Sequence, residues 1–119
     1  MDEIDFESDT FEDIVAKDSR YDGRAYALLM DCIHFLGKEG KHMTADDILD
    51  EFKERALDQF GPLSYTVLTE WGLSRTEDIG EMMFNLVEFN RVRKDEDDRH
   101  EDFCGGYDFK EAFLGPYST

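Results

Sequence analysis

The stretch EWGLSRTEDIGEMMFNLVEFN, residues 70–90, carries the strongest fold signal in this chain. It predicts the end of one helix, a tight turn at Gly72, and a second helix over residues 76–90 capped by Ser74 or Thr76. This order is typical of a helix-turn-helix, in which the second helix reads DNA. Whether it does so here depends on the side chains that this helix presents to solvent.

At 100° per residue, apolar side chains and Gly80 cover more than half of the circumference of the helix over residues 76–90. The remaining face carries Glu77, Asp78, Glu81, Asn85 and Glu88. A DNA-reading helix needs donors for base edges and cations for phosphates, so the acids on this face would be repelled by DNA. We therefore expect a buried apolar arc, an exposed acidic face, and close packing of another helix at Gly80.

Hydrophobic periodicity predicts four further helices in the earlier part of the chain. They cover residues 11–17, 24–36, 44–60 and 63–71. Thr10 and Thr44 are the expected N-caps, whereas Gly37 and the Gly-Pro pair at 61–62 are the expected ends. The predicted buried faces of the first three helices are Phe11, Ile14 and Val15; Ala25, Leu28, Leu29, Cys32, Ile33 and Leu36; and Ile48, Leu49, Phe52, Ala56, Leu57 and Phe60.

Two further segments read as strands of a C-terminal β-hairpin, RVRK (91–94) and GGYDFKEAF (105–113), around the acidic loop DEDDRHEDF (95–103). KEGKHM (38–43) reads as a turn with a short strand. The expected fold class is therefore mainly α (α+β), with about five helices and a C-terminal β-hairpin. Both a winged-helix-like core and a plain five-helix bundle with a β-tail fit this order.

Acidity dominates the composition, because 30 Asp and Glu against 13 Lys and Arg give the 119-residue chain a net charge of −17. The acids concentrate in residues 1–19 and 95–119, which disfavours non-specific binding of nucleic acid. We expect an acidic N-terminal segment over residues 1–9 and a single α-rich domain over residues 10–119.

Localisation is predicted from two absences in the sequence. No apolar run approaches the roughly 20 residues that span a membrane, and MDEIDFESD lacks the basic start and apolar stretch of a signal peptide. We therefore expect a cytoplasmic protein in which Cys32 and Cys104 are free thiols.

The acidic loop resembles a calcium site only at its start. Asp95 and Asp97 have the first EF-hand spacing, but Arg99 and His100 occupy positions five and six, and Gly106 stands where the bidentate Glu belongs. The other candidates for a metal site contain no CxxC or HxxxH pair; they are His34, His42, Cys32 and Cys104. No metal or cofactor is predicted.

Catalytic motifs are also missing, since the chain has no GxSxG, GxxxxGK[ST] or GxGxxG. Cys104 is the sharpest candidate nucleophile, because the following glycines could expose backbone amides. Its neighbours Asp102 and Asp108 would disfavour the thiolate, so we predict a protein that is not an enzyme. Four aromatic residues fit either the core or an interface: Tyr65, Trp71, Phe84 and Tyr107.

Three stretches resemble a bacterial family of small hypothetical proteins of unknown function: RYDGRAYALL (20–29), ALDQFGPLSYTVLTEWGLSRTEDIGEMMFNLVE (56–88) and EDFCGGYDFKEAF (101–113). The resemblance covers residues 11–114, and its central block is the most specific part. It implies a single bacterial cytoplasmic domain. It implies no activity, cofactor or catalytic residue.

The leading hypothesis is a non-catalytic acidic interaction module of the bacterial cytoplasm that binds a basic protein partner. One alternative is a winged-helix-type, transcription-associated or DNA-binding protein that binds DNA through the basic cluster Arg91, Arg93 and Lys94, or that has lost DNA binding. The neighbouring acids offer this cluster partners within the chain. Another alternative is a DNA mimic. Candidate interaction residues are Glu77, Asp78, Glu81, Asn85, Glu88, Arg91, Arg93 and Lys94.

Overall fold

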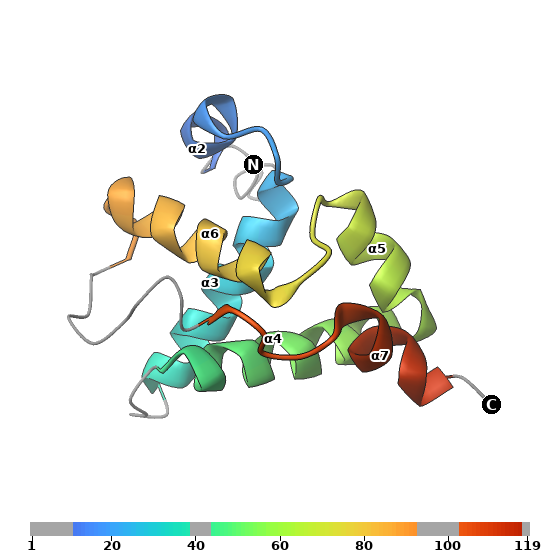
Figure 1. The fold of residues 1–119 in the computed structure, drawn as a ribbon. Coiled ribbons are helices and arrows are strands. Elements are labelled where there is room, and N and C mark those ends of the chain that lie inside the picture. Colours follow the sequence, from blue (N-terminus) through green and yellow to red (C-terminus); the bar gives the residue numbers. More distant parts are fainter. Residues whose placement is uncertain (1–10, 39–43, 93–102, 118–119) are drawn as a thin grey trace, which may run out of the picture.

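A computed structural model describes residues 11–38, 44–92 and 103–117, and this part of the chain is mainly helical (Figure 1). The elements are α2 (Glu12–Lys17), α3 (Gly23–Lys38), α4 (Ala45–Phe60), the 3-10 turn η1 (Gly61–Leu63), α5 (Ser64–Glu70), α6 (Thr76–Glu88), α7 (Phe109–Leu114) and the 3-10 turn η3 (Gly115–Tyr117). The helices predicted from periodicity are confirmed within two residues at their described ends.

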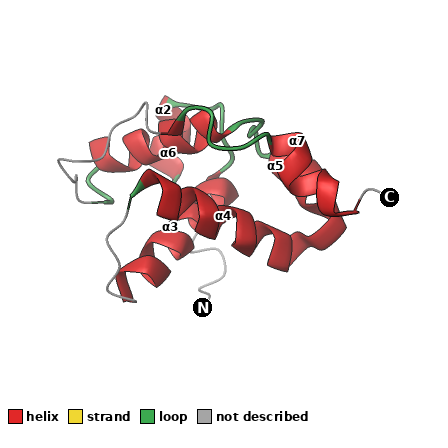
Figure 2. Cartoon of the chain, turned by 60° about the horizontal axis from the view of Figure 1, so that its bottom comes forward, coloured by secondary structure: helices red, strands yellow, loops and turns green. Residues whose placement is uncertain are grey.

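The helices pack around one hydrophobic core. α3 packs against α4, while α5 and α7 pack against each other and both contact α4 (Figures 1 and 2). The predicted buried faces are confirmed at most positions, and the three exceptions are only partly buried: Val15, Leu57 and Phe60. None of the helices in the described ranges is long and apolar enough to cross a membrane.

α4 begins and ends as its sequence predicts. The Thr44 hydroxyl accepts a hydrogen bond from the Asp47 backbone N–H at 3.1 Å, and the Asp47 carboxylate accepts one from the Thr44 N–H at 3.4 Å. This capping box satisfies two backbone donors that the first helical turn cannot. The helix stops at Gly61, whose φ of +53° suits a residue without a side chain.

The start of α6 differs from the prediction, because neither Ser74 nor Thr76 caps the helix with its side chain. Asp78 accepts hydrogen bonds from the backbone N–H groups of Ser74 (2.9 Å) and Arg75 (3.2 Å) instead. The Thr76 hydroxyl donates to the Phe103 carbonyl at 2.6 Å and accepts from the Gly106 N–H at 3.0 Å. Thr76 therefore fastens the 103–106 turn to α6.

The C-terminal β-hairpin is not found among the described residues, which contain no strand. The prediction of a strand over GGYDFKEAF is wrong, because Asp108 caps α7 by accepting a hydrogen bond from the Glu111 N–H at 3.0 Å. Phe109 and Phe113, four residues apart, then stack edge to face with ring centroids 4.9 Å apart. The described residues thus show the α part of the expected class without a wing.

Three other boundary predictions have different outcomes. Gly37 does not end α3, which continues to Lys38. Arg91 and Val92 lie in a bend rather than a strand. Thr10, the 39–43 part of KEGKHM, the rest of RVRK, the loop residues 95–102 and the segment 1–9 lie outside the described residues.

Gly80 is a position of close packing, as predicted, although the neighbour is Phe103 rather than another helix. A Cβ added at Gly80 would lie 2.8 Å from the Phe103 Cβ. Glycine weakens a helix interior by about 1 kcal/mol relative to alanine, so its presence in α6 reflects the space that Phe103 occupies.

Gly80→Ala and Gly37→Ala form a matched pair, since both substitutions are made in helices. Nothing lies within 4 Å of a Cβ at Gly37, so Gly37→Ala should raise the free energy of unfolding by about 0.5 kcal/mol. Gly80→Ala should lower it by about 1–2 kcal/mol through overpacking against Phe103. Urea denaturation followed by circular dichroism measures both, and an equal gain in stability would contradict the packing at Gly80.

Candidate functional site

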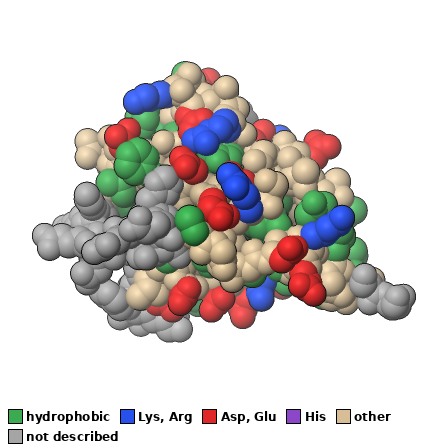
Figure 3. Space-filling model, in the orientation of Figure 1, with side chains coloured by type: hydrophobic (Ala, Val, Ile, Leu, Met, Phe, Trp, Pro, Cys, Tyr) green, Lys and Arg blue, Asp and Glu red, His purple; other side chains and the backbone are tan. Residues whose placement is uncertain are grey.

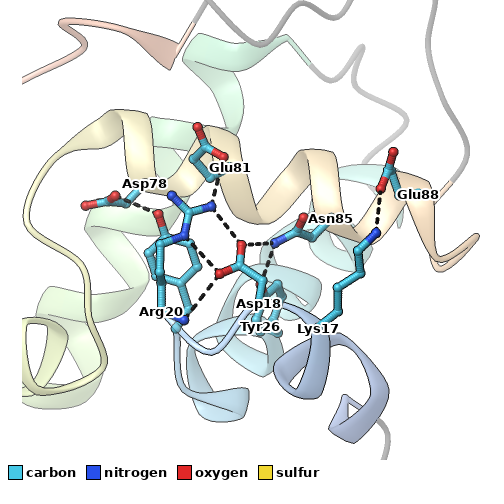
Figure 4. Close-up of polar contacts among 9 residues, drawn as sticks. Lys17, Asp18, Arg20, Tyr26, Asp78, Glu81, Asn85 and Glu88 are labelled. Atoms are coloured by element: carbon cyan, nitrogen blue, oxygen red, sulfur yellow. Dashed lines mark hydrogen bonds and ion pairs between the residues drawn. The ribbon is translucent and has the colours of Figure 1, made fainter.

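The polar face of α6 lies against the segment that joins α2 to α3 (Figure 4). Asp78 at its start is buried, so its predicted exposure is wrong. The Tyr21 hydroxyl donates a hydrogen bond to one Asp78 oxygen at 2.7 Å, while the other oxygen caps α6. Burial raises the pKa of Tyr21, and the hydrogen bond to Asp78 raises it further. Tyr21 is therefore a neutral donor at physiological pH.

Asp18 is the centre of a second set of contacts on this face. The Arg20 guanidinium donates two hydrogen bonds to the Asp18 carboxylate, at 2.7 and 2.9 Å, and one to Glu81 at 3.1 Å. The Asn85 amide donates to Asp18 at 2.9 Å and to the Tyr26 hydroxyl at 3.0 Å. The hydrogen bonds from Arg20 hold the pKa of Asp18 well below its usual range.

The remaining predicted interaction residues lie in different surroundings. Glu88 forms a long ion pair of 3.9 Å with Lys17 on the surface, and Glu77 is half-buried. Arg91 donates to Asp13 at 2.8 Å and lies over the Phe11 ring, 5.5 Å from its centroid. Arg93 and Lys94 lie outside the described residues.

The predicted face of α6 therefore joins two parts of the chain. Asp78, Glu81 and Asn85 come together with residues 18–26, and Arg91 binds α2. We name these contacts the α6 polar network. Because its carboxylates already accept hydrogen bonds within the chain, the face predicted for a partner is largely occupied.

The reactive side chains in the described part of the chain offer little chemistry. No group of three His, Cys, Asp or Glu side chains there is arranged to hold a metal ion. Cys32 and Cys104 are free thiols. Cys32 is buried in the core, and burial raises its pKa to about 12, so it is not a nucleophile at neutral pH.

An acidic stripe on the outer face of α4 contrasts with the α6 polar network. Its four carboxylates recur every fourth residue and are exposed: Asp46, Asp50, Glu54 and Asp58. The opposite face of α4 is buried in the core. α4 lies along the face turned forward in Figure 2, and acidic side chains line the lower edge of the molecule over α4 in Figure 3.

The stripe is not neutralised from within the described chain. None of its four carboxylates forms an ion pair with a residue in the described ranges. The adjacent Arg55 pairs with Glu51 at 2.8 Å and lies over the Phe35 ring. Glu54 and Asp58 line a shallow, open hollow together with these α4 neighbours. The stripe thus presents four carboxylates that form no ion pair within the described residues, although Arg55 lies nearby.

Sequence reasoning missed the acidic stripe, although its signal was present. Four acids at i, i+4 spacing in DDILDEFKERALD (46–58) must share one side of a helix. The spacing in this helix was interpreted only for its buried face and not for its acids. The α6 polar network left no such signal, because its partners lie as far as 78 residues apart in the chain.

Comparisons of this chain with protein-family models, curated proteins and solved structures found no match. The resemblance to a bacterial family stays a prediction, and the candidate site depends on the geometry described above.

Asp18→Asn tests the α6 polar network through its pH dependence. The folded pKa of Asp18 is lowered, so its stabilisation is present above the ordinary value of 3.8 and is lost as the pH falls below it. At pH 7 the variant should be less stable by about 1–2 kcal/mol. The difference from wild type should shrink towards pH 3 in urea denaturation.

Asp31→Asn is the matched control, since Asp31 is exposed on α3. Its effect on the free energy of unfolding should stay within about 0.5 kcal/mol at each pH. A difference between wild type and Asp18→Asn that is constant from pH 7 to pH 3 would refute the assigned role of the Asp18 carboxylate.

Proposed function

We propose that this protein is a non-catalytic interaction module that binds a partner protein with a basic surface through the acidic stripe of α4. The observation that carries this proposal is the run of exposed carboxylates Asp46, Asp50, Glu54 and Asp58 without ion-pair partners in the described chain. At 1.5 Å per residue the stripe is about 18 Å long. This length suits the edge of a specific protein interface.

Helix stability does not account for the stripe. Like charges at i, i+4 destabilise a helix by about 0.2–0.5 kcal/mol per pair, and the stripe contains such pairs along its whole length. Arginines elsewhere are used to neutralise carboxylates, as Arg20, Arg24 and Arg91 are. A cationic partner would relieve the repulsion, and the net charge of −17 would speed its approach.

The DNA-binding alternative has less support. The α6 face that would enter a groove contributes to the α6 polar network, and its remaining surface is acidic. Arg91, one of the three cations of the proposed basic cluster, pairs with Asp13. The described residues also lack the strands of a wing. We therefore rank DNA binding below an acidic protein interaction.

DNA mimicry stays an alternative that the stripe itself favours. Successive carboxylates on α4 are about 6 Å apart along the helix axis, so they form a regular row of negative charges. A DNA-binding protein would then be the basic partner. Competition with duplex DNA distinguishes this case from an ordinary acidic interface.

Neutralising the stripe should abolish partner capture without unfolding the chain. The test variant is Asp50→Asn, Glu54→Gln and Asp58→Asn, and the control is Glu12→Gln, Asp31→Asn and Glu70→Gln, which are exposed positions elsewhere. Both variants lose the same three charges. In pull-downs at low salt, wild type and control should retain the same partner, whereas the stripe variant should bind it at least about tenfold more weakly.

The outcomes separate the alternatives. Capture that disappears at high salt and in the stripe variant alone supports the proposal, and release by duplex DNA would identify a DNA mimic. Equal weakening in both triple variants would show that only overall charge matters. If no protein is retained at low salt, or if the stripe variant binds like wild type, the proposal is wrong.

A further inference from the structure

Two neighbouring turns at the C-terminal end of α4 expose apolar side chains. η1 reads Gly-Pro-Leu and η3 reads Gly-Pro-Tyr. Leu63 is 63% exposed and Tyr117 is 45% exposed. A Cβ at Gly61 would lie 4.0 Å from the Tyr117 hydroxyl, so the Tyr117 side chain lies beside η1. With the exposed Pro62 and Pro116 they form what we name the end patch.

The end patch differs from the other exposed apolar positions of the described chain. Phe35 and Phe84 are the other large exposed hydrophobic residues there, and they lie on different helices, α3 and α6. Single exposed apolar residues are ordinary on protein surfaces. Apolar residues on two neighbouring turns, each with a proline of fixed φ, instead offer a preformed apolar surface.

The surroundings of the end patch are negative. α4 ends at Gly61, so the negative end of its dipole lies there. Asp58, the last residue of the acidic stripe, is exposed three residues before Gly61. On the other side, the Cγ of exposed Glu111 lies 3.6 Å from a Cβ position at Gly115. An apolar ligand group is therefore favoured when it is attached to a cationic chain.

We propose that the end patch anchors one large apolar side chain of the same basic partner whose cations face the acidic stripe. This inference rests on the proposed function and specifies its partner. The occupant is a basic segment that carries Lys or Arg along about 18 Å and an aromatic or large aliphatic residue beside them. Buried aromatic anchors commonly dominate the binding energy of such interfaces.

Charge complementarity favours this occupant over two others. A second copy of the chain would bring another net charge of −17 against the negative surroundings of Asp58 and Glu111. An anionic lipid surface would be repelled for the same reason. A basic segment instead gains from both the apolar contact and the charges around it.

Defined helical peptides test the anchor directly. Each carries four lysines at i, i+4 spacing, with tryptophan at the N-terminal end, tryptophan at the C-terminal end, or alanine at both. Fluorescence anisotropy at low salt should show that one tryptophan peptide binds wild type about tenfold more tightly than the alanine peptide. Leu63→Ser/Tyr117→Ser should reduce this gain to less than about twofold, whereas the control Phe84→Ser should keep it. Circular dichroism confirms that each variant is folded.

The results separate failure of the anchor from failure of the proposed function. Salt-sensitive binding of all three peptides with equal affinity, or a tryptophan gain that survives in Leu63→Ser/Tyr117→Ser, overturns the anchor and leaves the proposed function standing. Binding of no peptide, or binding unchanged by the triple substitution in the stripe, overturns both. A wild-type dimer that becomes monomeric in Leu63→Ser/Tyr117→Ser would assign the end patch to a second copy and overturn the proposal.

Discussion

The buried hydrogen bond from the Tyr21 hydroxyl to Asp78 is the contact on which the arrangement of the helices depends. It joins Tyr21, two residues before α3, to the first turn of α6, while the same carboxylate caps α6. The backbones on either side of this contact also meet, since the Asp22 N–H donates a hydrogen bond to the Trp71 carbonyl at 3.0 Å. Gly72 has φ of +98°, and a Cβ there would lie 2.1 Å from the Arg20 carbonyl oxygen. Only glycine fits this crossing.

This crossing also determines which charges remain for a partner. Because Asp18, Arg20 and Glu81 bind one another where residues 18–26 meet α6, most of the polar groups on α6 are used inside the molecule. α4 has no comparable segment against its outer face in the described chain, so its carboxylates remain exposed. Tertiary contacts thus determine which carboxylates are paired and which stay exposed. Helical periodicity alone does not reveal this difference.

The sequence predicted well those features that depend on neighbours within a helix. The buried positions of α3 and α4 follow from i, i+3 and i, i+4 spacing, and Thr44 with Asp47 forms a local capping box. The C-terminal strand was mistaken because Phe109 and Phe113 fit a buried strand face as well as a helix face. Tertiary packing against α5 and α4 decides between them.

The candidate site likewise combines features set by spacing within a helix and features set by tertiary contacts. Helical spacing placed the polar residues of α6 on one face, but their partners in residues 17–26 are remote in sequence, so the burial of this face was not predictable. The stripe on α4 was predictable from spacing, yet its importance appears only when the charges elsewhere are seen to be paired. Local sequence patterns therefore predict most of the helices, whereas identifying the charges that stay exposed requires the tertiary structure.

The separation of Tyr21 and Asp78 by 57 residues has a consequence for folding kinetics. α3, α4 and α5 follow one another in the chain, and their contacts close short loops. The contact between Tyr21 and Asp78 closes a loop that contains all three helices. Since non-local contacts cost loop-closure entropy before they stabilise a structure, the docking of α6 on residues 17–26 has a larger entropic cost than the contacts between successive helices.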